Sequence, residues 1–138
     1  MNLVLTALLL TTLLTQKDLE PTVPDVPERI RVLAIHATSE GRAVPSSDPT
    51  LAPVQEFLDT LPYDTFREMS FHDMMVEYGV DSQAALNEVY TFFCRPARLT
   101  EADEVVLEAH IDMKRDGDTV EALRVTGRAA RGQGMVFR

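Results

Sequence analysis

Hydrophobic and polar positions divide the chain into three unlike parts, the first of which is an apolar N-terminal run. Leu3 to Leu14 is interrupted only by threonines, and no charged side chain precedes Lys17. Twelve helical residues reach about 18 Å, well short of the roughly 30 Å hydrocarbon core of a membrane. This length favours a secretory leader, so we predict that residues 1–16 are a signal peptide or a short N-terminal membrane anchor. A helix of the mature domain is the alternative interpretation.

A proline-rich acidic segment forms the second part. Prolines at 21, 24 and 27 recur every third residue and alternate with acidic side chains. Because proline fixes φ and disfavours helix at the residue before it, this spacing favours an extended polyproline-like segment. We predict a linker over residues 17–28.

The third part begins with one strand and one helix. Residues 29–36 are apolar at both strand parities, which predicts a central strand covered on both faces. After a polar loop over 37–49, Thr50 is the expected N-cap of a helix that Pro62 ends. The helix would bury a single apolar stripe made of Leu51, Val54, Phe57, Leu58 and Leu61.

Strand patterns dominate the rest of the chain. We predict strands over 66–78 and 89–95, separated by a turn over 79–87 with room for one helical turn after Ser82. Residues 104–113 alternate cleanly, with His110 and Asp112 on the polar face, as in a half-buried antiparallel strand.

A hairpin is expected to follow this alternating strand. Asp116-Gly117 marks its tip, and residues 119–126 return beside the first strand. With a turn over 127–134, the pattern predicts one α+β domain over residues 29–138. In that domain one helix would pack on a mixed or mostly antiparallel sheet of five to six strands.

The last predicted strand is short. Met135, Val136 and Phe137 begin it just before Arg138. A strand this short is expected at a sheet edge, or to be completed by another chain, since edge strands offer unpaired N–H and C=O groups. These three residues are therefore the candidate partner edge.

Charge and cysteine content exclude several classes of function. The chain has 13 basic and 22 acidic residues and a formal net charge of −9. Phosphate groups repel such a chain, which argues against nucleic-acid binding and against recruitment to anionic lipid. Membrane contact is expected only through residues 3–14. The single cysteine, Cys94, cannot form an intramolecular disulfide or a multi-thiolate zinc site, and we expect it to be buried and inert.

Candidate chemistry is confined to histidines with nearby carboxylates and to one basic loop. His36, His72 and His110 fall in different predicted strands, and no pair has a metal-ligand spacing. We predict no catalytic residue, no metal ligand and no cofactor. The alternative is a small metal-dependent hydrolase that uses His72 and His110 with Asp73 and Asp112. The basic loop, which contains Arg128 and Arg131 and follows Arg124, would either meet an acidic partner or simply end a hairpin.

One set of motifs resembles a known class of protein. Residues 31–37 are followed by Asp48-Pro-Thr-Leu51, a helix, and Leu61-Pro-Tyr-Asp-Thr-Phe66. Together they resemble small exported domains of envelope-rich bacteria with a strand, a D-P-x-L helix, an L-P-Y-x-x-F motif and a β-rich remainder. The resemblance covers residues 29–66, and this chain departs from it over 70–88. It implies a fold and a location but no reaction.

These observations predict an exported, periplasmic or secreted, non-enzymatic module that binds a protein or assembles in the cell envelope. Its partner would be another protein or a second copy of the chain. A second possibility is an accessory subunit of a membrane-bound complex, held by an uncleaved N-terminal helix.

Overall fold

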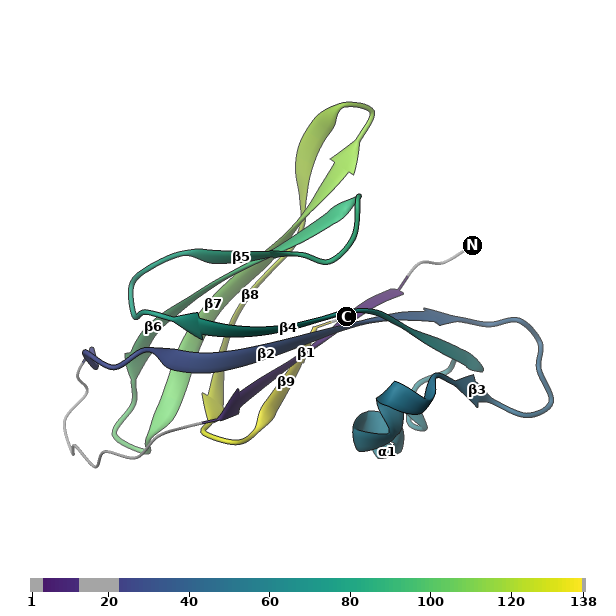
Figure 1. The fold of residues 1–138 in the computed structure, drawn as a ribbon, viewed down its shortest axis with the longest axis horizontal. Helices are drawn as coiled ribbons and strands as arrows, with labels where there is room; N and C mark the ends of the chain where they lie inside the picture. The colour runs from purple at the N-terminus through teal and green to yellow at the C-terminus, as the bar shows by residue number, and fades with distance from the viewer. Residues whose placement is uncertain (1–3, 13–22, 138) are drawn as a thin grey trace.

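The backbone forms two sheets packed face to face, in a computed structural model that describes residues 4–12 and 23–137 (Figure 1). The five-stranded sheet has the order β3-β4-β2-β1-β9 and the four-stranded sheet has the order β5-β6-β7-β8. Adjacent strands are antiparallel except β3 and β4, which are parallel. The strands are β1 (Val4–Thr12), β2 (Glu28–Thr38), β3 (Ser46–Ser47), β4 (Thr65–Val76), β5 (Ser82–Ala85), β6 (Tyr90–Leu99), β7 (Glu104–Arg115), β8 (Asp118–Ala130) and β9 (Gly134–Phe137).

The predicted α+β class, with one helix on a single sheet of five to six strands, is wrong. Helix is limited to a 3₁₀ turn, η1 (Pro49–Val54), and one α-helical turn, α1 (Gln55–Leu58). Ten residues of helix cannot cover the apolar face of strands that run for ten to thirteen residues. The chain instead buries the apolar face of each sheet against the other, which is the arrangement of a β-sandwich.

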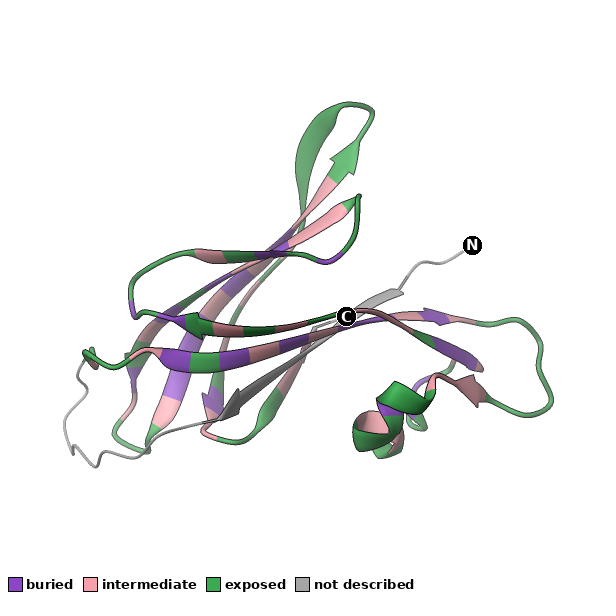
Figure 2. Ribbon diagram, in the orientation of Figure 1, coloured by how far each residue is buried: buried purple, intermediate pink, exposed green. Residues whose placement is uncertain are grey.

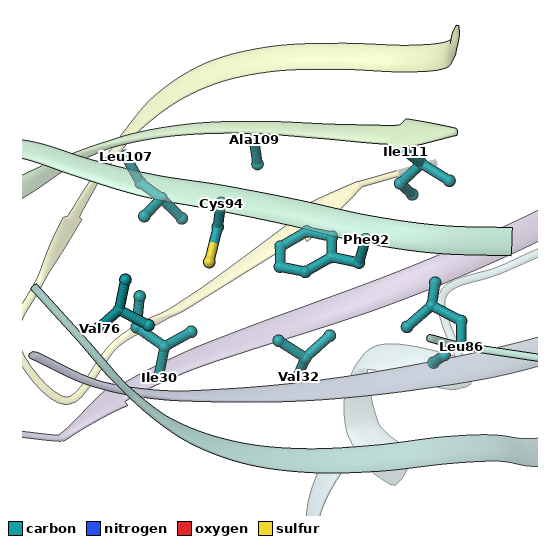
Figure 3. Close-up of a cluster of buried hydrophobic side chains, with 10 residues drawn as sticks. Ile30, Val32, Val76, Leu86, Phe92, Cys94, Leu107, Ala109 and Ile111 are labelled. Atoms are coloured by element: carbon teal, nitrogen blue, oxygen red, sulfur yellow. The ribbon is translucent and has the colours of Figure 1, made fainter. Parts of the chain in front are cut away.

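The main core lies between the two sheets (Figure 3). Ile30, Val32 and Ala34 of β2 face Phe92 of β6 and Leu107 of β7, and all five side chains are buried. Strand β7 shows the predicted alternation, since Val105, Leu107, Ala109 and Ile111 are buried while its polar residues lie on the other face. The half-buried antiparallel strand expected over 104–113 is therefore confirmed.

A second core lies on the opposite face of β2. Ile35 and Ala37 pack there against Leu51, Leu58 and Phe66, beneath η1 and α1. Strand β2 lies between β4 and β1 and buries both parities, so the central strand predicted from its apolar pattern is confirmed. The first half of β2 therefore packs in the core between the sheets, and its last residues pack beneath η1 and α1.

The helical segment is shorter than its apolar stripe predicts. Thr50 lies inside η1 and is not the N-cap; Asp48 occupies that position, without a side-chain cap hydrogen bond. The two prolines account for the difference, because Pro49 starts the helix one residue early and Pro53 removes an N–H from its interior. The stripe itself is correct, since Leu51, Leu58 and Leu61 are buried.

Three other segments differ in detail. The turn expected over 79–87 contains strand β5, paired with β6, and no helical turn. Strand β8 extends to Ala130, so the turn predicted over 127–134 shrinks to residues 131–133. The hairpin tip is confirmed, because Asp116 and Gly117 have φ of 53° and 85°, as a two-residue turn of the mirror-image type I′ requires.

The N-terminal run forms a strand in this structure. Each residue of β1 pairs with β2, and Ala7 to Leu10 also pair with β9. Residues 13–22, which include the first half of the predicted linker, lie outside the described residues. Glu28, the last residue assigned to the linker, is buried at the start of β2. No helix in the described ranges is long and apolar enough to cross a membrane.

Candidate functional site

The predicted partner edge, Met135 to Phe137, forms the short strand β9 at one end of the five-stranded sheet. Gly134 to Phe137 pair with Leu10 to Ala7 of β1, and in the described part of the chain no strand is hydrogen-bonded to the other side of β9. A last strand at a sheet edge is therefore confirmed. Its contact with a partner stays a prediction.

Met135 belongs to the core as much as to the edge. Its side chain is partly buried against the main core cluster and lies over Gly127 of β8. A Cβ added at Gly127 would lie 2.3 Å from the Met135 Cε atom, so the end of the Met135 side chain would have to shift to make room for it. The edge is thereby held against the end of β8, and the side chain of Val136 is left half-buried.

A buried polar cluster fixes the turn that leads into β9. Glu28 is 2% exposed, and its Oε1 accepts hydrogen bonds from the Tyr78 hydroxyl at 2.6 Å and from Arg131 Nη2 at 3.1 Å. Arg131 Nη1 also lies 3.3 Å from Asp103 Oδ1. This cluster joins the start of β2 to the β8–β9 turn across 103 residues of sequence.

Burial and the adjacent carboxylate determine the chemistry of Tyr78. Desolvation, followed by the hydrogen bond and the negative charge of Glu28, raises the pKa of the Tyr78 hydroxyl far above its usual value. The hydroxyl therefore stays protonated and donates to Glu28. Sequence reasoning missed this cluster, because Glu28 looked like a solvated linker residue and Tyr78 like the end of a strand.

The histidines lie in three different surroundings. His72, on β4, has its Nε2 atom 2.9 Å from the backbone oxygen of Ala85, so it links the edges of the two sheets. His110 lies on the outer face of β7 and stacks on the ring of Phe93, with centroids 4.5 Å apart. His36 is half-buried on β2. The alternative hydrolase needs His72 beside His110, but the structure places the two on different sheets.

One part of that alternative set does come together. His110, Asp112 and Glu121 have ligand atoms within 4.8 Å of one another, and His110 Nε2 lies 3.8 Å from Asp112 Oδ1. Asp112 and Glu121 are cross-strand partners on β7 and β8. However, Arg124 donates hydrogen bonds to both Glu121 oxygens, at 2.9 and 2.6 Å, so a cation already occupies this carboxylate.

Asp73, the carboxylate next to His72, serves an ion pair. Arg29 donates to both of its oxygens, and Arg31 Nε lies 3.7 Å from Oδ2. The hydrogen bond from Arg29 holds the pKa of Asp73 below its usual value. These three residues lie on the outer face of the five-stranded sheet, where the neighbouring Phe71 and Met75 are exposed.

The structure explains Cys94 by burial and the arginines near the basic loop by ion pairs. Cys94 is buried in the main core, and this desolvation raises the pKa of its thiol to about 12, as expected for an inert cysteine. Two of the three arginines near the loop form ion pairs inside the chain, Arg124 with Glu121 and Arg131 with Glu28. These pairs favour the interpretation of the loop as a hairpin end.

Comparison of the chain with protein-family models, with curated proteins and with solved structures finds no match. The case for any function therefore rests on the geometry of the chain itself.

Proposed function

We propose that this chain is a non-enzymatic protein-binding module of the cell envelope and that it meets its partner through β9. The observation that carries the proposal is the place of β9 at the end of the five-stranded sheet, bonded to β1 on one side. The backbone N–H and C=O groups on the other side of such a strand can pair with a strand of another protein.

The surroundings of β9 support this role. Arg131 is anchored by Glu28 just before the strand, and Met135 is held over Gly127 within it. A strand fixed in position loses little conformational entropy when a partner adds to it, so more of the interaction energy appears as affinity.

The non-enzymatic part of the proposal draws on the roles of the candidate side chains. Asp73 is held by Arg29, Glu121 is held by Arg124, and Cys94 is buried as a thiol. Asp73 of the hydrolase alternative, the Glu121 carboxylate beside His110, and the one thiol are thus engaged in structure.

The proposed location leaves two possible fates for the N-terminal segment, which are cleavage and retention. The residues whose pattern predicts a leader are those that form β1 between β2 and β9. Removal of residues 1–16 would leave the facing edges of β2 and β9 open to a strand from the partner. Retention would keep β1 in the sheet, as in an accessory subunit of a membrane complex.

Site-specific photo-crosslinking in the native host tests the binding edge. A photoreactive amino acid at Val136 should give a discrete adduct with one envelope protein, and excess unlabelled chain should compete for it. The matched control is the same probe at Val44, which is exposed in the loop before β3, at the opposite end of the five-stranded sheet from β9. This control should give no adduct. Equal labelling from both positions, or none from Val136, contradicts the proposal.

The mass of the native protein tests the location. Loss of about sixteen N-terminal residues, with recovery in the periplasmic or secreted fraction, agrees with a cleaved leader. An intact Met1 in the membrane fraction would favour the accessory-subunit alternative. An intact chain in the cytosol contradicts export in either form.

A further inference from the structure

The outer edge of β8 is the longest strand edge that the structure leaves open. Strand β8 has 13 residues and ends the four-stranded sheet, with β7 as its hydrogen-bonded neighbour. Among the described residues no strand pairs with its other side. Figure 1 shows the hairpin of β7 and β8 projecting beyond the other strands, and Figure 2 shows that its outer half is exposed.

The sequence of β8 has a two-fold pattern about a point between Ala122 and Leu123. It reads Thr-Val-Glu-Ala-Leu-Arg-Val-Thr from Thr119 to Thr126. If a second copy lay antiparallel beside it about this point, each threonine would face a threonine and each valine a valine. Glu121 would face Arg124 of the other copy, so the only charged positions of the segment would be complementary.

A β-bulge makes this arrangement consistent with the two faces of the sheet. In a regular strand Glu121 and Arg124 would point to opposite faces, because they are three residues apart. Ile111 pairs with Leu123 and Asp112 with Glu121, so Ala122 is an extra residue that restores both side chains to the outer face. Val120 and Val125 are likewise both brought to the inner face.

The charges also disfavour nearby registers. A shift that places the two-fold axis on Glu121 would bring two carboxylates together, and a shift to Arg124 would bring two guanidinium groups together. Edge strands commonly carry charges that prevent pairing. Here the charges of β8 repel each other in these two shifted registers and attract in the register that places Glu121 opposite Arg124.

We propose that two copies of this chain associate through β8, with Glu121 of each copy opposite Arg124 of the other. The dimer joins the four-stranded sheets into one continuous sheet of eight strands across a two-fold axis. Such an interface is self-complementary, since every contact occurs twice.

Two features of the monomer favour the second copy as the occupant of this edge. Val120 is 47% exposed on the inner face of the hairpin, and pairing covers it with Val125 of the other copy. Arg124 already binds Glu121 of its own chain, so the dimer would place two carboxylates and two guanidinium groups in alternation around the axis. This proposal concerns a different edge from β9 and does not depend on partner binding there.

Charge reversal with rescue tests the pairing. We expect sedimentation of the full chain to show a monomer–dimer equilibrium with a dissociation constant on the order of 10 μM, in keeping with a small interface. Glu121→Arg and Arg124→Glu should each weaken the dimer at least about tenfold, because each creates two like-charge contacts. The double variant should return to within about threefold of the original.

A matched control separates this effect from a change in net charge. Glu40 pairs with Arg42 and is about as exposed as Glu121, but lies in a loop of the other sheet. Glu40→Arg should leave the dimer unchanged, and circular dichroism should show all variants folded. A chain that stays monomeric up to about 1 mM, or single reversals that dimerise normally, would overturn the proposal.

Disulfide trapping tests the register. Thr119→Cys mixed with Thr126→Cys should form a crosslinked heterodimer on mild oxidation, since these positions face each other across the axis. Thr119→Cys alone should not crosslink, because its two copies would lie about 23 Å apart along the strands. The native thiol does not interfere, since Cys94 is buried. Efficient crosslinking of Thr119→Cys with itself would show a different register and overturn the proposal.

Discussion

Replacing Arg131 by methionine should destabilise the protein by about 3 kcal/mol, because it leaves the Glu28 carboxylate without its cation in a buried position. The Glu28 side chain is 3% exposed and that of Arg131 is 14% exposed, so water cannot substitute for the lost guanidinium. The Tyr78 hydroxyl still donates to Glu28, which keeps the loss at the lower end of the range for buried pairs.

Urea unfolding followed by circular dichroism measures this loss. With a slope of about 1.5 kcal/mol per M for a domain of this size, the midpoint should fall by about 2 M while the slope stays constant. Hydrogen exchange at the β9 amides should also accelerate, because Arg131 fixes the turn before that strand.

A double-mutant cycle isolates the pair from other effects of truncation. In the Arg131→Met background, Glu28→Gln should lower the free energy of unfolding by much less than it does in the original protein. The coupling energy between the two substitutions should be about 2 kcal/mol. Arg42→Met is the control, since the Arg42–Glu40 pair is nearly half-exposed and is worth under about 1 kcal/mol. A loss below about 1 kcal/mol for Arg131→Met, or a coupling near zero, would refute the reasoning.

Four further outcomes are expected. Gly127→Ala should destabilise the protein by under about 1 kcal/mol in urea unfolding, because the new methyl group meets only the movable end of the Met135 side chain, and Met135→Ala should remove most of this penalty. Cys94 should react with a thiol reagent only as fast as the chain unfolds, and identical rates in native and denatured protein would contradict its burial. Hydrogen bonds from the Glu40 and Arg42 amides hold the pKa of Asp64 below its usual value, so the stability that this carboxylate contributes should be fully present above the ordinary aspartate pKa and be lost as pH falls through the depressed value, which NMR titration of Asp64 can locate. Because Arg124 occupies Glu121, purified protein should contain no stoichiometric zinc, and one bound zinc per chain would instead favour the hydrolase alternative.

Local patterns along the chain predicted several strands well. The alternation of β7, the two-sided burial of β2 and the turn at Asp116-Gly117 each depend on neighbouring residues alone, so the sequence carries the signal directly. The position of β9 at a sheet edge also followed from its short pattern.

The division into two sheets could not be predicted in the same way. Each sheet has one apolar face. The alternation of apolar and polar residues along a strand does not show whether a helix or another sheet covers that face. The prolines at 49 and 53 limited the helix, but the apolar stripe from Leu51 to Leu61 suggested a larger one. Strand β5 was missed because four polar and small residues carry no strand pattern of their own.

The candidate sites show the same limit. The positions of His110 and Asp112 on the polar outer face follow from the strand pattern, but the approach of Glu121 depends on a hairpin register with a bulge. The cluster of Glu28, Tyr78 and Arg131 joins residues from three distant parts of the chain, and no local signal marks it.

The pairing of β1 with β9 has a consequence for synthesis. Leu10 pairs with Gly134, so one side of β1 has no neighbour until more than 120 further residues have been translated. At bacterial and eukaryotic elongation rates this takes about 6 to 25 s. During that interval a targeting factor would compete only with β2 for the apolar segment from Val4 to Thr12, and the pairing of β9 with β1 would then end that competition.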